Sequence, residues 1–272
     1  MTIFQSILLG IVQGMTEFIP ISSSGHLVIV PYLLGWDFPP AQAFAFDVLV
    51  QVATLVGVVA FFWRDIFTIT RATLLGLVHK QPFADEKARL GWYLLLATIP
   101  AVAAGLLLKK PVEKAFDNPQ GTAIFLLVTA GLLIAAERIG KRSRKLDSLT
   151  WKDALWIGIF QALALFPGVS RSGATISGAM TRDLERPTAA RFSFLMSIPI
   201  MLGAGLVATL DLMRIPNLGA LLPVFIPGFI TAAVVGYLVI KWLLTFLSRY
   251  PLYIFAIYCV ALGIVTLAVG SL

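Results

Sequence analysis

Six segments of this chain are apolar and long enough to cross a bilayer as helices, which takes about 20 residues each. They lie at 43–63, 90–109, 121–138, 191–211, 224–247 and 251–270. Because 58% of the 272 residues are hydrophobic and only 13% are charged, a soluble domain of this size cannot bury the apolar surface. We therefore expect an all-α integral membrane protein, a polytopic helical bundle with about six spans. A soluble enzyme and a disordered chain are excluded.

Two further apolar stretches are interrupted by short polar segments. Residues 3–35 contain the run ISSSGH, and residues 153–181 contain the run GVSRSG. Irregular backbone at membrane depth is tolerated only where protein groups or a wet cavity satisfy its N–H and C=O groups. Each stretch is therefore predicted to form a re-entrant helical hairpin that does not cross the membrane.

The two interrupted stretches resemble each other. GIVQGMTEFIPISSSG at 10–25 and GIFQALALFPGVSRSG at 158–173 are identical at seven of sixteen positions. Each copy precedes three predicted spans, and an odd number of spans makes the second copy enter the membrane upside down. We expect one membrane domain, 1–272, built as an inverted-topology repeat with halves 1–138 and 153–272 and a linker at 139–152.

Basic residues are distributed unequally between the two sides of the predicted bundle. Of the 21 Lys and Arg residues, sixteen fall at 64–89, 138–152, 182–191 and 241–249, and four fall in the opposite loops. The positive-inside rule places the sixteen in the cytoplasm and both termini outside. The net charge of +7 therefore indicates membrane orientation and no nucleic-acid partner. The linker run KRSRK is interpreted as a solvated loop, with binding of anionic headgroups as the alternative.

Glu17 and Gln13 are candidate metal ligands in the first hairpin. They stand four residues apart, so they share one helix face. A carboxylate and an amide oxygen suit Mg²⁺ or Ca²⁺ held jointly with a phosphate. The alternative is that Glu17 only pairs with Arg171 and holds the hairpins together.

The serine cluster and His26 follow Glu17 in the same hairpin. Hydroxyls and free N–H groups ahead of a helix favour anion binding, although Ser22 and Ser24 are equally suited to cap the helix. Ser23 is the stronger catalytic candidate, because the second repeat has Arg171 at its position. His26 is a candidate general base, general acid or phosphoryl-accepting nucleophile.

Arg171 is the only basic residue assigned to membrane depth. Its planar guanidinium matches phosphate in bidentate fashion, so it is predicted to clamp an anion, with a salt bridge to Glu17 as the compatible alternative. Ser170, Ser172 and Thr175 surround it as further candidate phosphate ligands. Outside the hairpins, Asp47, Gln51 and Thr54 are weaker candidates for lining a cavity, and Cys259 is interpreted as a small buried hydrophobe.

The motifs GIVQGMTEFIPISSSGH and FPGVSRSGAT together resemble the undecaprenyl-diphosphatase family, also called bacitracin-resistance proteins. The resemblance covers essentially the whole chain. It implies metal-dependent hydrolysis of undecaprenyl diphosphate to undecaprenyl phosphate, in the bacterial inner membrane, at a site that opens to the periplasmic side. The positions that carry it are Gln13, Glu17, Ser23, His26, Ser170, Arg171 and Thr175. Gln13 stands where many family members have Glu, which removes one charge from the metal site.

The mechanism expected from the resemblance is phosphoryl transfer driven by charge neutralisation. Glu17 and Gln13 would hold the metal, Arg171 would clamp the phosphate, and His26 or Ser23 would supply the attack. The substrate partner is a polyprenyl diphosphate among membrane lipids, and a homo-oligomer is left open. The inverted repeat also suits a secondary transporter or lipid flippase, and a non-catalytic lipid-binding or ion channel is a third hypothesis. Neither of these needs a nucleophile, so phosphate release in detergent discriminates between them and the enzyme.

Overall fold

The computed structural model describes residues 1–116, 118–213 and 218–269. Within these ranges it contains eleven α-helices, one short 3₁₀ turn at Leu146–Ser148 and no strand beyond one isolated bridge between Arg144 and Leu184. The prediction of an all-α polytopic membrane bundle is confirmed. Arg214, which is one of the four basic residues assigned to the opposite loops, and residue 270, which ends the last predicted span, lie outside the described residues.

Six apolar helices correspond to the six predicted spans. Five are long enough to cross a membrane, and the sixth, α11, has 17 described residues. The six are α3 (Pro40–Val78), α4 (Glu86–Leu107), α6 (Pro119–Ile139), α9 (Arg186–Leu212), α10 (Leu218–Leu247) and α11 (Tyr253–Val269). A further short helix, α5 (Lys109–Phe116), lies in a segment that was predicted to be a loop.

The helix α3 is much longer than the predicted span. It contains 39 residues and bends at Phe62, whose backbone leaves helical values at φ −98° and ψ 17°. At about 1.5 Å per residue such a helix exceeds the roughly 30 Å hydrocarbon core almost twofold. The prediction ended the span at residue 63 because Arg64 and Asp65 end the apolar run, but no Pro or Gly stops the helix there.

Two pairs of short helices form the predicted hairpins. The first pair is α1 (Ile3–Thr16) with α2 (Ser23–Leu33), and the second is α7 (Trp151–Leu163) with α8 (Arg171–Met180). With 10 to 14 residues each, these helices are too short to span a bilayer. The hairpin tips are alike, because Ser22 and Ser170 each cap the second helix by accepting a hydrogen bond from a glycine N–H three residues later.

Helix packing follows the correspondence between the repeats. Helix α1 packs along α10 and its counterpart α7 packs along α4, while α3 meets α9 and α6 meets α11. Gly10 in α1 lies against the backbone of Gly228, and its repeat counterpart Gly158 lies against the backbone of Ala97. Neither position has room for a Cβ atom, which explains why both repeats carry glycine there. The half boundaries and the opposite insertion of the halves stay a prediction.

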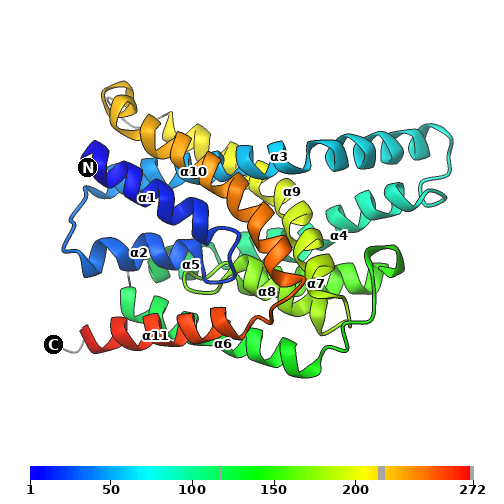
Figure 1. Cartoon of the computed structure of the whole chain (residues 1–272). Helices are drawn as coiled ribbons and strands as arrows, with labels where there is room; N and C mark the ends of the chain where they lie inside the picture. The colour runs from blue at the N-terminus through cyan, green and yellow to red at the C-terminus, as the bar shows by residue number, and fades with distance from the viewer. Residues whose placement is uncertain (117, 214–217, 270–272) are drawn as a thin grey trace.

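The start of α1 and the described end of α11 lie at one end of the bundle (Figure 1). The turn between α3 and α4 and the linker after α6 lie at the opposite end, which we call the basic end (Figure 1). This arrangement agrees with hairpins that do not cross the membrane, since two additional crossings would separate the segments that the sequence placed together.

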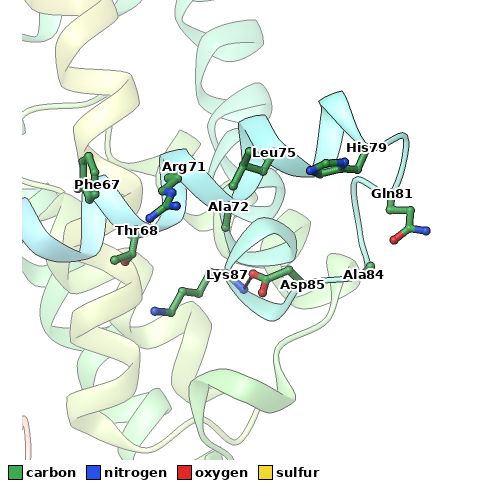
Figure 2. A pocket seen from close by; sticks show the side chains of 11 residues that line it. Phe67, Thr68, Arg71, Ala72, Leu75, His79, Gln81, Ala84, Asp85 and Lys87 are labelled. Atoms are coloured by element: carbon green, nitrogen blue, oxygen red, sulfur yellow. Dashed lines mark hydrogen bonds between the residues drawn. The ribbon is translucent and has the colours of Figure 1, made fainter.

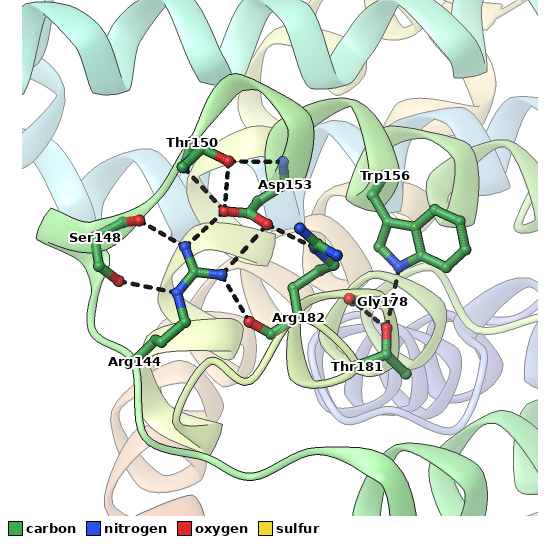
Figure 3. Close-up of polar contacts among 8 residues, drawn as sticks. All are labelled: Arg144, Ser148, Thr150, Asp153, Trp156, Gly178, Thr181 and Arg182. Atoms are coloured by element: carbon green, nitrogen blue, oxygen red, sulfur yellow. Dashed lines mark hydrogen bonds and ion pairs between the residues drawn. The ribbon is translucent and has the colours of Figure 1, made fainter.

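Asp153 anchors the linker at the basic end (Figure 3). Its carboxylate is fully buried and accepts hydrogen bonds from Arg144 in the linker, at 2.7 Å, and from Arg182 after α8, also at 2.7 Å. Burial alone would raise the pKa of Asp153, but the hydrogen bonds from the two arginines and from Thr150 hold it below its usual value. The charge network therefore ties the linker to the base of the second hairpin.

Glu137 forms the matching anchor at the end of α6. Its carboxylate is 5% exposed and pairs with Arg142 at 2.7 Å and with Arg186, at the start of α9, at 2.5 Å. It also accepts the backbone N–H of Leu252 just before α11, at 2.8 Å. A single carboxylate thus holds α6, the linker, α9 and α11 together at the basic end.

Candidate active site

Glu17 lies at the point where the two hairpins meet. It ends α1, and its side chain is only 4% exposed. One carboxylate oxygen, Oε1, accepts a hydrogen bond from Arg171 of the second hairpin, and the other, Oε2, accepts from Gln13 at 2.9 Å and from Ser23 at 2.6 Å. The structure therefore brings together four residues that the sequence singled out. We call Gln13, Glu17, Ser23 and Arg171 the Glu17 cluster.

Arg171 is the first residue of α8, directly after the cap residue Ser170. Its side chain is 20% exposed, which is far less than an arginine in solvent. A guanidinium carries five N–H donors. Among the described residues, the side chain of Arg171 donates one hydrogen bond, to Glu17. The remaining donors are available to an anion at the hairpin tips.

His26 follows Ser23 closely in the sequence, but its buried side chain is held by Ser22 and Tyr258, which do not belong to the Glu17 cluster. Its Nδ1 lies 2.6 Å from the Ser22 carbonyl oxygen and its Nε2 lies 2.8 Å from the Tyr258 hydroxyl. A carbonyl only accepts, so Nδ1 carries the proton and the neutral ring accepts from Tyr258 at Nε2. The two rings also stack, with centroids 5.6 Å apart. No side-chain hydrogen bond or ion pair joins His26 to Glu17 among the described residues.

Ser22 ties the hairpins to each other. Its hydroxyl accepts from the N–H of Gly25 at 3.2 Å and from the N–H of Gly168 in the second hairpin, also at 3.2 Å. Its backbone adopts φ 72°, a region that costs free energy for a residue other than glycine. The capping alternative therefore describes Ser22 in this structure. Ser24 is half-buried, and its hydroxyl contacts that of Ser22 at 3.3 Å.

The other hydroxyls of the second hairpin are also engaged by protein groups. Ser170 caps α8 at Gly173, and the Ser172 hydroxyl donates to the carbonyl of Ile19 at 3.2 Å. The Thr175 hydroxyl contacts Ser193 of α9 at 2.6 Å. All three predicted phosphate ligands are at most 3% exposed. In this structure they hold the hairpin tips in place around the Glu17 cluster.

The weaker candidates lie outside this cluster. Thr54 is buried and its hydroxyl donates to the carbonyl of Gln51, whose own side chain is exposed, while Asp47 is half-buried in the same helix. Cys259 is fully buried, as predicted for a small hydrophobe. Tyr258 beside it is the residue that sequence reasoning missed, because an isolated tyrosine in an apolar span carries no motif.

The donor set of the cluster fits one kind of metal site. The Oε1 atom of Gln13 is buried and has no hydrogen-bond partner among the described residues. No group of three or more His, Cys, Asp and Glu side chains gathers within the described ranges, so an all-protein metal cage is not formed there. One carboxylate and one free amide oxygen suit a Mg²⁺ or Ca²⁺ ion that completes its shell with substrate phosphate and water.

The chain is similar to known proteins over its whole length. A family model described as bacitracin resistance protein BacA matches residues 6–265. An undecaprenyl-diphosphatase of Thermomicrobium roseum is 43% identical over 278 residues, covering 100% of this chain and 99% of the relative. An undecaprenyl-diphosphatase of Moorella thermoacetica is 44% identical over 270 residues, covering 99% and 98%. The match with the Thermomicrobium roseum relative covers both hairpins and all six apolar helices.

Proposed function

The chain belongs to the bacitracin resistance protein BacA family, and we propose that its Glu17 cluster is where it hydrolyses undecaprenyl diphosphate to undecaprenyl phosphate and phosphate. This phosphatase activity recycles the lipid carrier of peptidoglycan synthesis and confers resistance to bacitracin. The observation that carries the proposal is the meeting of Glu17 and Arg171 from two different hairpins, inside an apolar bundle. Ionisable side chains at membrane depth are costly, so such a pair marks a functional site.

Arg171 is proposed to bind the diphosphate. It stands at the first turn of α8, where the helix dipole and the guanidinium both favour an anion. When substrate enters, the planar fork exchanges Glu17 for phosphate oxygens. The exchange keeps the arginine paired in both states, which avoids the cost of an unpaired buried charge.

Glu17 and Gln13 are proposed to hold a divalent metal, Mg²⁺ or Ca²⁺. The support is the free Oε1 of Gln13 and the release of Glu17 Oε1 when Arg171 moves to substrate. When bound, such an ion would neutralise negative charge on the diphosphate. The Glu that many family members carry in place of Gln13 would serve the same purpose.

Ser23 is favoured over His26 as the attacking group. The Ser23 hydroxyl already donates to Glu17 Oε2 at 2.6 Å, so the carboxylate is placed to take its proton. As Ser23 Oγ bonds to the terminal phosphorus, the bridging P–O bond breaks and its electron pair leaves with the lipid phosphate. Water then releases phosphate from the serine. His26, held by Ser22 at Nδ1, is proposed to take a proton from that water at Nε2 once the Tyr258 hydroxyl has turned away from that nitrogen.

We propose that the protein lies in the bacterial inner membrane with its site open to the periplasmic side. The support is the distribution of ion pairs. Apart from Glu17–Arg171, the ion pairs among the described residues lie at the basic end or in the helices that lead to it, namely Glu137 with Arg142 and Arg186, Asp153 with Arg144 and Arg182, and Asp65 with Arg191. These pairs join helices and the linker to one another at the basic end. A transporter or flippase would have to break them, and that alternative is not favoured.

Two substitutions test the metal proposal. Glu17→Ala should abolish metal-dependent phosphate release from undecaprenyl diphosphate, whereas Gln13→Glu should retain it, because it restores a stronger oxygen ligand. Glu86→Ala, which removes an exposed carboxylate at the start of α4, is the matched control. Near-normal turnover of Glu17→Ala with an unchanged response to Mg²⁺ would place the metal elsewhere.

A further inference from the structure

An open groove lies between α3 and α4 at the basic end, and none of the residues that line it belongs to a hairpin (Figure 2). Its volume is about 420 Å³. The part of α3 beyond the Phe62 bend forms one wall, and the start of α4 forms the other (Figure 2). The phosphatase mechanism uses none of the residues that line it, so the groove calls for its own explanation.

Two cations enter this groove without a protein partner. Figure 2 shows the side chains of Arg71 and Lys87 in the gap between the two helices. Neither side chain makes an ion pair or hydrogen bond with any described residue. The one carboxylate in the lining, Asp85, caps α4 by accepting the N–H groups of Lys87 and Ala88 at 2.8 and 3.0 Å. The arginines that pair elsewhere at the basic end show the contrast, namely Arg142, Arg144, Arg182, Arg186 and Arg191.

The surface around these cations is apolar. Phe67 in the lining is 61% exposed, and Leu74 and Val78 on the same helix end are 57% and 74% exposed. A helix end that combines basic residues with exposed large hydrophobic residues is typical of the membrane interface. A soluble anion would pair with the cations but would leave this apolar surface in water. An anionic amphiphile would pair with the cations and also cover the apolar surface.

We propose that the groove binds an anionic phospholipid of the leaflet at the basic end. The lipid phosphate lies between Arg71 and Lys87, and the acyl chains run along Phe67 and Leu75. The inference is independent of the phosphatase site, because the groove and the Glu17 cluster share no residue. It assigns a specific lipid contact to the α3–α4 end, which reaches beyond the rest of the bundle in Figure 1.

Native mass spectrometry of the full chain in detergent tests the proposal. Phosphatidylglycerol and phosphatidylcholine are titrated separately, and the dissociation constant of the first bound lipid is compared. Each interfacial cation contributes about fivefold to the affinity for an anionic lipid, so Arg71→Gln with Lys87→Gln should weaken phosphatidylglycerol by about 25-fold. Phosphatidylcholine binding and phosphate release should stay unchanged, the latter showing that the variant is folded.

Lys145→Gln is the matched control, since it removes one exposed positive charge from the linker at the same end. It should leave the affinity for phosphatidylglycerol as it is. A double variant with undiminished selectivity would overturn the proposal, and so would an equal loss in Lys145→Gln. Competition by glycerol phosphate as strong as by the intact lipid would also overturn it, because the apolar wall would then contribute nothing.

Discussion

Removal of the Glu17–Arg171 pair, one partner at a time and then together, separates its structural role from its catalytic role. Arg171→Gln leaves Glu17, 4% exposed, without its cation. Loss of one partner of a buried pair costs about 3–5 kcal/mol, and we expect the lower end because Gln13 and Ser23 still donate to the carboxylate. Glu17→Gln costs less, because Arg171 is 20% exposed and reaches water. The double variant should lose about 2 kcal/mol less of its free energy of unfolding than the sum of the losses in the two single variants.

Activity should follow a different pattern from stability. Arg171→Lys keeps the charge beside Glu17, so its melting temperature in detergent should stay near that of the wild type. Its phosphate release should fall about a hundredfold, because lysine lacks the bidentate fork and about 3 kcal/mol of charge stabilisation is lost. The Glu17→Gln and Arg171→Gln double variant should be more stable than Arg171→Gln alone and still inactive.

Thermal melting and phosphate release are measured on the same detergent preparations, with Glu86→Ala as the control for an unrelated charge. Wild-type phosphate release by Arg171→Lys would refute the clamp. Recovery of activity in the double variant would show that the pair only holds the hairpins together. Additive stability losses would show that the two side chains do not interact as the structure describes.

Three further predictions concern other parts of the molecule. Tyr258→Phe removes the donor to His26 Nε2 and should lower kcat several-fold and shift the acidic limb of its pH profile, with KM little changed; an unchanged profile would leave Tyr258 without a role. An impermeant thiol reagent should label Asp37→Cys but not Ser143→Cys in intact cells with a cysteine-free background, and the reverse pattern would invert the orientation. Asp153→Asn should destabilise the protein at neutral pH, with the difference from wild type shrinking below about pH 4, since stabilisation from a lowered carboxyl pKa is lost as pH falls. A pH-independent difference in melting temperature would contradict that last prediction.

The architecture could be predicted because the bilayer restricts it. Apolar length gave the six spans, and the polar runs ISSSGH and GVSRSG gave the hairpins, since irregular backbone cannot face lipid. The boundaries were harder. The prediction ended the span of α3 at the last residue of the apolar run. A helix can continue past that point as long as no residue interrupts its backbone hydrogen bonds, and α3 continues to Val78. The helix α5 was missed because eight charged and apolar residues carry little signal.

The sequence predicted which charged residues meet in the candidate site better than it predicted the partners of the hydroxyl groups. Glu17 and Arg171 stand in apolar segments, where each requires a partner, so their meeting could be expected. Hydroxyl groups have many possible partners, and the sequence does not distinguish a hydroxyl that caps a helix or pairs with another residue from one that binds a ligand. The contact between the hydroxyls of Thr175 and Ser193 is an example. Tyr258 comes from a helix 232 residues away from His26, and only the three-dimensional structure reveals the contact.

Phosphate release from undecaprenyl diphosphate by the purified full chain, in detergent and without any ion gradient, tests the central claim most directly. The assay is run with EDTA and then with Mg²⁺ or Ca²⁺ added back. We predict steady release that EDTA abolishes and the added ion restores, because we propose that Glu17 and Gln13 hold a divalent cation that would neutralise charge on the diphosphate. Release that persists undiminished in EDTA would contradict the metal site, and no release under any condition would contradict the assignment of hydrolysis to the Glu17 cluster.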